Sequence, residues 1–224
     1  MEEKIEVLGI RMDCLGAKEA MLLAMQFMEN DSVDTIEIMS MDVLMKGQED
    51  SDWQNWTKEV KLLLPGESEI LEAAEIHDRQ KLKETGNRVF LKMFLKYLQK
   101  NRKRVYLLAE TGEQIERAEG AIRRYNRGLR ITGHALLEPD HNREEEVINE
   151  INGTETDCII SVLSSPYQEE FISRNKTLLN IKIWFGCGAM LERSYDDRQT
   201  LDKIRHFFRK TMFQRRVEKQ QKEK

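Results

Sequence analysis

The feature that most constrains the fold is a regular alternation of short apolar runs with amphipathic stretches of helical period. Several runs are almost continuous Val, Ile and Leu, which is typical of strands in a parallel sheet whose two faces are both covered. The predicted strands are Ile5–Ile10, Thr35–Met39, Val60–Leu64, Arg104–Ala109, Asp157–Leu163 and Ile181–Phe185, with a weaker one at Arg130–Gly133. The predicted helices are Lys18–Glu29, Ser51–Lys58, Ser68–Glu84, Asn87–Lys100, Gly112–Arg127, Glu144–Ile151 and Gln168–Leu179. This order predicts an α/β fold, a Rossmann-like wound and mostly parallel sheet with helices on both faces.

No stretch rich in Gly, Pro or Ser divides the chain, which has 224 residues with only 3 Pro and 12 Gly. A chain of this length forms one large domain or two small ones. We therefore expect one α/β domain over residues 1–195. From Arg198 onward the chain lacks Gly and Pro and has the pattern of a single helix, so residues 196–224 are expected to form a helical appendage.

The C-terminal segment is predicted to be a basic amphipathic helix. Its apolar residues recur mostly at steps of three and four, and from Ile204 to Lys224 there are eight Lys or Arg but only two Glu. Such a helix can lie on an anionic membrane surface. The residues expected to make that contact are Phe207, Phe208, Arg209, Arg215 and Arg216. The alternatives are that the apolar stripe docks on the sheet, with a solvated charged end, or that it faces a second copy of the chain in a homo-oligomer.

Charge and composition argue against several classes of protein. Lys and Arg total 36 against 40 Asp and Glu, and the net charge of −4 argues against a nucleic-acid binder. The longest apolar run, Ala20–Met25, is far shorter than the about 20 residues that span a bilayer. The 3 Cys and 4 His show no spacing typical of a disulfide framework or a metal site. We therefore expect a protein of the reducing cytoplasm that uses neither a metal nor a cofactor.

In wound α/β sheets, ligands bind in the loops that follow the carboxyl ends of the strands. The most informative of these loops follows the predicted strand that ends at Leu163. Its Ser165-Pro166 pair is typical of a helix start, whose free N–H groups and positive dipole end suit a phosphate. Gln168 can form hydrogen bonds with a uracil or a sugar, and Glu169 can accept them from hydroxyl groups. The alternative is an ordinary capped helix with Glu in its first turn.

Two other loops give weaker indications. Glu67 and Glu69 follow the third predicted strand, where a general base can stand, but a helix start attracts the same residues. Gly186 and Gly188 follow the last predicted strand and would let the backbone approach a ligand closely. The sequence contains no G-x-G-x-x-G fingerprint, no P-loop and no Ser-His-Asp signature.

Short segments along almost the whole chain occur in an order that is typical of one enzyme family. They are Val7–Asp13, Glu19-Ala20, Leu63-Leu64-Pro65, Arg88-Val89, Arg104–Leu108, Gly128–Gly133 and Ser165-Pro166-Tyr167-Gln168-Glu169. The last is the most specific, because it reads S-P-x-Q-E directly after a predicted strand. In order and spacing the segments resemble the WecG/TagA/CpsF family of bacterial glycosyltransferases.

The resemblance implies an inverting, metal-independent hexosyltransferase of cell-wall or extracellular polysaccharide synthesis, for example of teichoic acid. The donor would be a UDP-linked sugar of the N-acetylmannosamine type, and the acceptor an N-acetylhexosamine on undecaprenyl diphosphate at the inner face of the cell membrane. Donor binding is expected at Ser165, Pro166, Gln168, Glu169 and Gly186. A phosphate or the acceptor is expected to meet Arg88 and Ser40. The family's C-terminal appendage is associated with the membrane and with closure of the active site, which agrees with the basic helix described above.

The chain departs from the family pattern in its strand-end loops. Where the family has P-D-G, with the Asp as its catalytic base, this chain has Pro65-Gly66-Glu67. We therefore expect Glu67, one position along, to supply the catalytic carboxylate, with Glu69 as a second choice. Further differences from the family lie at Ile38, Ser40, Leu91, Met93, Ala109, Glu110 and Ser164.

Three functions stay open at this point. The first is an active, divergent glycosyltransferase. The second, favoured by the replaced Asp, is a catalytically impaired member that binds a nucleotide sugar, a lipid-linked glycan or an enzyme partner. The third is an unrelated α/β protein whose basic end recruits it to a membrane or to RNA. The third predicts no affinity for uridine nucleotides and a steep salt dependence of binding.

Overall fold

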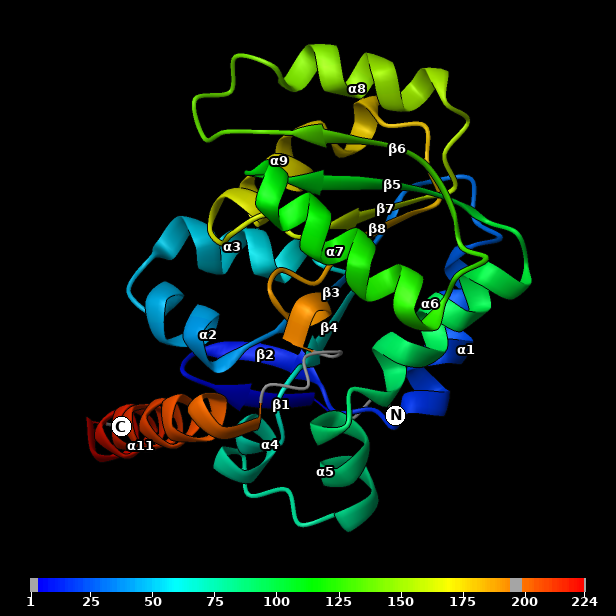
Figure 1. Ribbon diagram of the computed structural model, residues 1–224. Helices are drawn as coiled ribbons and strands as arrows, with labels where there is room; N and C mark the ends of the chain where they lie inside the picture. Colours follow the sequence, from blue (N-terminus) through cyan, green and yellow to red (C-terminus); the bar gives the residue numbers. More distant parts are fainter. Residues whose placement is uncertain (1–3, 194–198, 224) are drawn as a thin grey trace.

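The computed structural model describes residues 4–193 and 199–223, with side chains for residues 4–191 and 206–222. Its centre is a six-stranded sheet in which every neighbouring pair is parallel, in the order β4-β3-β8-β7-β5-β6 (Figure 1). The strands are β3 (Asp34–Met39), β4 (Leu62–Pro65), β5 (Arg104–Ala109), β6 (Arg130–Leu136), β7 (Cys158–Ser161) and β8 (Ile183–Gly186). Each corresponds to a strand expected from the sequence. The predicted α/β fold is therefore confirmed.

The first apolar run departs from the prediction, because it does not join the main sheet. It forms a separate antiparallel hairpin of β1 (Lys4–Val7) and β2 (Ile10–Asp13), joined by Leu8 and Gly9. Both turn residues have positive φ, 52° and 81°. A two-residue turn of this kind matches the twist of the strands that it joins. The single strand expected at Ile5–Ile10 is therefore wrong.

Helices cover both faces of the sheet, as expected. One face packs against α1 (Ala17–Phe27), α6 (Val89–Lys100) and α7 (Gly112–Tyr125), and the other against α8 (Glu144–Gly153) and α9 (Tyr167–Asn175) (Figure 1). The arrangement follows from the apolar stripe of each helix, which is buried only when it faces the sheet.

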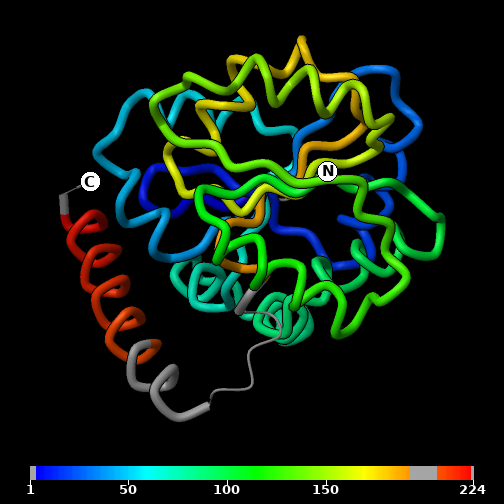
Figure 2. Tube along the Cα trace, turned by 45° about the horizontal axis from the view of Figure 1, so that its top comes forward, coloured from blue at the N-terminus to red at the C-terminus, as the bar shows by residue number. Residues whose placement is uncertain are grey.

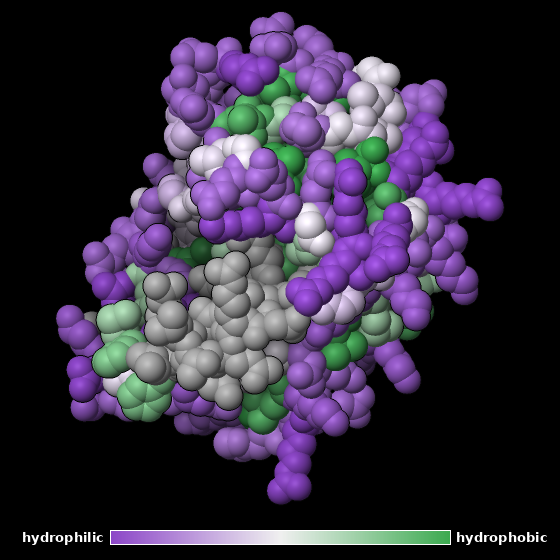
Figure 3. Space-filling view, in the orientation of Figure 1, coloured by the Kyte–Doolittle hydropathy of each residue, from purple (hydrophilic) through white to green (hydrophobic). Residues whose placement is uncertain are grey.

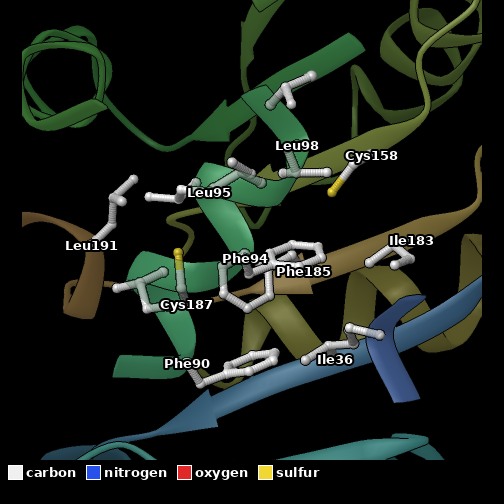
Figure 4. Packing of buried hydrophobic residues seen from close by; sticks show 14 of the residues in the cluster. Ile36, Phe90, Phe94, Leu95, Leu98, Cys158, Ile183, Phe185, Cys187 and Leu191 are labelled. Carbon is white, nitrogen blue, oxygen red and sulfur yellow. The ribbon is translucent and has the colours of Figure 1, made fainter. Parts of the chain in front are cut away.

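The core beneath α6 is built from aromatic rings (Figure 4). Phe90 and Phe94 of α6 stack with ring centres 5.9 Å apart, and Phe94 meets Phe185 of β8 at 4.8 Å. Phe94 and Phe185 are fully buried. Rings of this size bury a large apolar area, so this contact fixes α6 on the sheet.

Two helical regions differ from the sequence prediction. The helix expected over Ser68–Glu84 is divided into α4 (Ser68–Ala73) and α5 (Arg79–Gly86), because Glu75 has a positive φ of 59° and Asp78 caps a new helix. The helix α2 (Met41–Gly47) was not predicted. The other helical elements are α3 (Ser51–Glu59), the 3₁₀ turn η1 (Lys176–Leu178) and α10 (Met190–Arg193).

The C-terminal helix α11 (Gln199–Glu223) lies along one flank of the molecule (Figure 2). Phe213 is fully buried and Val217 is 8% exposed, both in a cluster with the β1–β2 hairpin, α2, α3 and α4. The helix therefore docks mainly on α2 and α4, on the side of the domain that carries the hairpin. The expected boundary between residues 195 and 196 lies outside the described residues, as do the side chains of Leu201 and Ile204 in the predicted apolar stripe.

Candidate functional site

A pocket opens at the carboxyl ends of β3, β7 and β8, in the middle of the sheet. The chain leaves β3 towards β4 at one edge and leaves β5 towards β6 at the other, and ligands of open α/β sheets bind in the crevice between such diverging connections. The pocket holds about 830 Å³ of space, part of it open to solvent. This central pocket is lined by residues 38–40, 162–165 and 187–190 together with Asp42, Val43, Lys46, Gln114, Gln168 and Glu169.

The structure brings four of the expected site residues together in the central pocket: Ser40, Ser165, Gln168 and Glu169. Ser165 Oγ donates a hydrogen bond of 2.6 Å to Glu169 Oε1. The N–H of Gln168 donates to the carbonyl of Ser164 at 3.0 Å, and the N–H of Glu169 donates to its own carboxylate. Two of the first amides of α9 are thus already engaged, so this helix start offers fewer donors to a phosphate than the sequence indicates. Pro166 is the N-cap residue of α9 and does not line the pocket.

Gly186 lies beneath the central pocket, at the end of β8, and pairs in register with Glu37 of β3. A Cβ atom here would lie 2.7 Å from Gln168 Nε2 and 2.9 Å from Glu37 Cγ, closer than real contacts allow. The missing side chain therefore lets Gln168 rest on the sheet beside Glu37. The backbone at Gly186 therefore lies directly beneath the side chain of Gln168.

Two carboxyl groups are buried together under the pocket, one of them missed by the sequence analysis. Glu37 has no exposed surface and Glu169 only 1%. Burial raises the pKa of Glu37 well above its usual range, and the neighbouring Glu169 raises it further. Burial also raises the pKa of Glu169 to about 7, although hydrogen bonds from Ser165 and from its own backbone oppose the rise. Glu37 was missed because the sequence does not show which face of a fully buried strand meets a polar partner.

Glu67, the expected catalytic carboxylate, is only 5% exposed. Its Oε2 accepts a hydrogen bond of 2.8 Å from the N–H of Met41, and its Oε1 lies 3.0 Å from Arg209 Nη2 of α11. Arg209 Nε also donates to Asp42 Oδ1 at 2.8 Å. Glu67 is not among the described residues that line the central pocket. Its carboxylate therefore joins the start of α2 to α11.

Gly66, which replaces the Asp of the family pattern, is tightly enclosed. A Cβ atom at this position would lie 2.7 Å from Ile38 Cγ2 and 2.8 Å from the carbonyl oxygen of Met39. The N–H of Gly66 donates to that same carbonyl at 2.7 Å. The loop is therefore packed around a glycine, and a carboxylate at this position requires the backbone to move.

The helix α2 adds Asp42 and Lys46 to the central pocket, and the sequence analysis missed both. Ser40 caps this helix by accepting a hydrogen bond of 3.3 Å from the N–H of Val43. A Ser followed two residues later by Asp, directly after a strand, is a helix-start signal that could have found it. Lys46 is exposed and brings a cation to the pocket wall.

Arg88 lies in a second pocket, defined here as the Arg88 pocket. Its wall is mostly apolar and includes Leu64, Pro65 and Phe90. The two pockets are neighbours, because Ile38 and Met190 line both of them. The structure thus separates Arg88 from Gln168 by a shared apolar wall.

The predicted membrane contacts divide into three groups on α11. Phe207 and Phe208 are 66% and 62% exposed, and Arg215 and Arg216 are exposed as well. Arg209 is turned inward to Glu67 and Asp42, so its guanidinium is not part of that exposed face. Figure 3 shows that the face of the molecule in this view is mainly hydrophilic, with smaller hydrophobic areas.

Two further properties concern the described residues only. No group of three or more His, Cys, Asp or Glu in this part of the chain has the arrangement of a metal site. None of the described helices combines the length and the hydropathy that a membrane span requires.

The comparisons with known proteins concern the family of the chain. Residues 5–197 match the profile of the glycosyl transferase WecG/TagA/CpsF family, whereas a search of curated proteins gives no match. The matched region contains the whole parallel sheet and both pockets. The chain therefore belongs to the WecG/TagA/CpsF family of glycosyltransferases, which implies a role in the synthesis of cell-wall polysaccharide.

Proposed function

We propose that the protein transfers an N-acetylmannosamine-type sugar from a UDP donor to an N-acetylhexosamine on undecaprenyl diphosphate, with inversion and without a metal. The observation that carries the proposal is the state of Gln168 in the central pocket. Gln168 is 4% exposed and lines the pocket, and its buried Oε1 has no hydrogen-bond partner among the described residues. A buried polar atom of this kind is satisfied when a ligand donates to it. The N–H of a uracil or a sugar hydroxyl supplies that donor.

The donor's diphosphate is assigned to the side of the central pocket where Lys46 stands. A lysine ammonium binds phosphate as a point charge, and Ser40 in the same wall offers a hydroxyl. The leaving UDP gains negative charge during transfer, so a cation at this position stabilises the transition state. Ser165 and Glu169 complete the donor side.

The acceptor is assigned to the Arg88 pocket. Its apolar wall suits the lipid-proximal part of the acceptor, and the guanidinium of Arg88 suits a phosphate oxygen. Ile38 and Met190, which line both pockets, would then form a thin wall between donor and acceptor. The acceptor hydroxyl must lose a proton as it attacks the sugar carbon, and Glu67 is the proposed base. To act in this way Glu67 has to be released by Arg209.

A second function, a catalytically impaired member that binds a nucleotide sugar or a protein partner, rests on a specific observation. Gly66 stands where the family has its Asp, and the packing around it leaves no room for a side chain. Glu67, the next residue along the chain, is held by Arg209 and by the N–H of Met41. This function predicts nucleotide binding without transfer.

The donor proposal is tested by thermal-shift titration of the full chain with UDP, UDP-N-acetylmannosamine and UDP-N-acetylglucosamine, with ADP as the control nucleotide. A ligand at about 100 times its Kd adds about 2.7 kcal/mol to the free energy of unfolding, which shifts Tm visibly. Gln168→Ala should weaken this effect, whereas Gln26→Ala, on the exposed side of α1, should not. No shift with any uridine nucleotide at millimolar concentration would contradict the proposal.

Glu67→Gln tests the proposed base in a transfer assay with the lipid-linked acceptor. Loss of a positioned base lowers kcat by roughly 10² to 10⁴. The matched variant Arg209→Gln breaks the same ion pair but keeps the carboxylate of Glu67, so its kcat should stay near the wild-type value or rise. Equal losses in the two variants would mean that the ion pair, rather than proton transfer, is what the reaction needs. Unchanged turnover in Glu67→Gln would refute the assignment of the base.

We also propose that α11 attaches the protein peripherally to the inner face of the cell membrane. Phe207, Phe208 and Met212 are exposed large apolar side chains on one helix, and the same helix carries the exposed Arg215 and Arg216. Aromatic residues beside cations bind an anionic lipid interface. Phe207→Ala and Phe208→Ala should each lower partition into anionic vesicles by about 10-fold or more, since a fully buried aromatic side chain contributes about 1.5–3 kcal/mol. Sedimentation with vesicles measures this, and unchanged partition would exclude α11 as the membrane contact.

A further inference from the structure

Two acidic side chains are buried at the central pocket, Glu169 in its wall and Glu37 beneath it, and no cation in the described part of the chain neutralises them. Glu37 and Glu169 are 0% and 1% exposed, and neither forms an ion pair with any described residue. An isolated buried carboxylate is very costly unless it is paired or protonated. Two carboxylates side by side at this depth would be costlier still.

The hydrogen-bond donors found around the pair reach only one oxygen of each carboxyl group. Glu37 Oε1 accepts from Trp184 Nε1 at 3.3 Å, and Glu169 Oε1 accepts from Ser165 Oγ at 2.6 Å. The Oε2 atom of each glutamate is buried without a donor among the described residues. Besides burial and the charge of Glu169, a side-chain hydrogen bond with Glu169 raises the pKa of Glu37, as expected when a protonated Glu37 donates to Glu169. A single proton between them therefore satisfies both of the remaining oxygens.

The charged groups on the surrounding elements do not replace that proton. Asp42 and Lys46 of α2 line the central pocket, and Glu59 of α3 and Lys176 of η1 line a small opening on the other side of Glu169. None of these four side chains, all within the described residues, forms a hydrogen bond or an ion pair with Glu37 or Glu169. Trp53 of α3 brings an indole N–H near Glu169 and so favours a negative charge on that member of the pair.

We infer that Glu37 and Glu169 share one proton. While this proton is present, Glu37 acts as a positioning residue that holds Glu169 and Gln168 in place at the central pocket. The link to Gln168 is direct. A Cβ atom at Gly186 would lie 2.7 Å from Gln168 Nε2 and 2.9 Å from Glu37 Cγ, so both side chains occupy the space that a side chain at this position would need. When the proton is lost, two buried negative charges face each other and separate, which displaces Gln168. The inference deepens the proposed function and rests on it for the identity of the ligand.

The shared proton is tested first without any ligand, by infrared spectroscopy of the whole protein. Ordinary Asp and Glu are ionised at neutral pH, so a C=O band of a protonated carboxyl at that pH reports the pair. We expect the band in the wild type and its loss in Glu37→Gln, because Gln donates to Glu169 permanently and leaves no proton to share. Absence of the band in the wild type, or its persistence in Glu37→Gln, would overturn the inference.

The positioning role is tested by calorimetric binding of UDP-N-acetylglucosamine between about pH 6 and about pH 8.5. In the wild type Kd should rise roughly 10-fold over this range, since only the protonated fraction is competent to bind. Glu37→Gln should bind with a flat pH profile, and Glu59→Gln, a nearby exposed glutamate, should keep the wild-type profile. Equal pH profiles in the wild type and Glu37→Gln would overturn the positioning role. Failure to bind at any pH would refute the proposed function and, with it, the positioning role of Glu37, while the infrared band would still decide whether the proton is shared.

Discussion

Replacing Phe213 with alanine is expected to lower the free energy of unfolding by about 3–5 kcal/mol and to release α11 from the domain. Phe213 is fully buried in a cluster with the β1–β2 hairpin, so its loss removes apolar contact and leaves a cavity. The ion pairs Arg209–Glu67 and Lys210–Glu72 also join α11 to the domain. The partly exposed pair Lys210–Glu72 contributes about 0–1 kcal/mol, and in the mostly buried pair Arg209–Glu67 the desolvation of both charges offsets much of their attraction. The apolar anchor should therefore dominate the docking of this helix.

Chemical denaturation measures the loss, and limited proteolysis of residues 199–223 reports the release of α11. Phe207→Ala is the matched control, because it removes the same side chain from the same helix at a position that is 66% exposed. Its effect should stay within about 0.5 kcal/mol. Similar effects of the two substitutions would show that Phe213 is not the anchor.

Stability is expected to fall as the pH rises from about 4.5 to above 7. Glu169 has its pKa raised from 4.5 to about 7, and that of Glu37 is raised as well. A group whose pKa is raised on folding keeps its proton in the folded state over a range in which the unfolded state has lost it. Its favourable contribution is complete below the unfolded pKa and disappears as the pH passes the folded one. For Glu169 alone the loss is on the order of 3 kcal/mol, at about 1.36 kcal/mol per pKa unit.

Other carboxyl groups act in the opposite direction at lower pH. Hydrogen bonds from the backbone and from His206 lower the pKa of Glu69 against the effect of burial, and those from His141, Asn175 and Tyr167 do the same for Glu144. Their contributions are lost as the pH falls below about 4.5. The pH profile of stability should thus have a maximum on the weakly acidic side of neutrality.

Denaturation midpoints measured across this pH range test the prediction. Glu37→Gln should flatten the alkaline side of the profile, because it removes one raised group and the charge that faces the other. The acid side, which depends on Glu69 and Glu144, should not change. Parallel profiles for the wild type and Glu37→Gln would contradict the buried pair as the cause.

The sequence by itself determined the sheet and the place of the S-P-x-Q-E loop. Strands such as Arg104–Ala109 are apolar on both faces because helices cover both, and this pattern is written locally in the chain. The S-P-x-Q-E segment follows a strand end, and carboxyl ends of parallel strands lie at one edge, so Ser165 and Gln168 were expected near a ligand. The hairpin at Leu8 and Gly9 escaped prediction because a turn with positive φ interrupts an apolar run without a polar residue to mark it.

Only the tertiary structure decided which partners the acidic residues of the candidate site meet. Glu67 pairs with Arg209, which lies 142 positions further along the chain. Glu37 of β3 interacts with Glu169 of α9, a helix that follows a different strand. Phe207 and Phe213 belong to one apolar stripe of the same helix and lie only 6 positions apart, yet Phe207 is exposed and Phe213 is buried. Periodicity is a property of neighbouring residues and therefore predicts elements. The partner that a side chain meets depends on how those elements pack, which burial and charge decide over the whole chain.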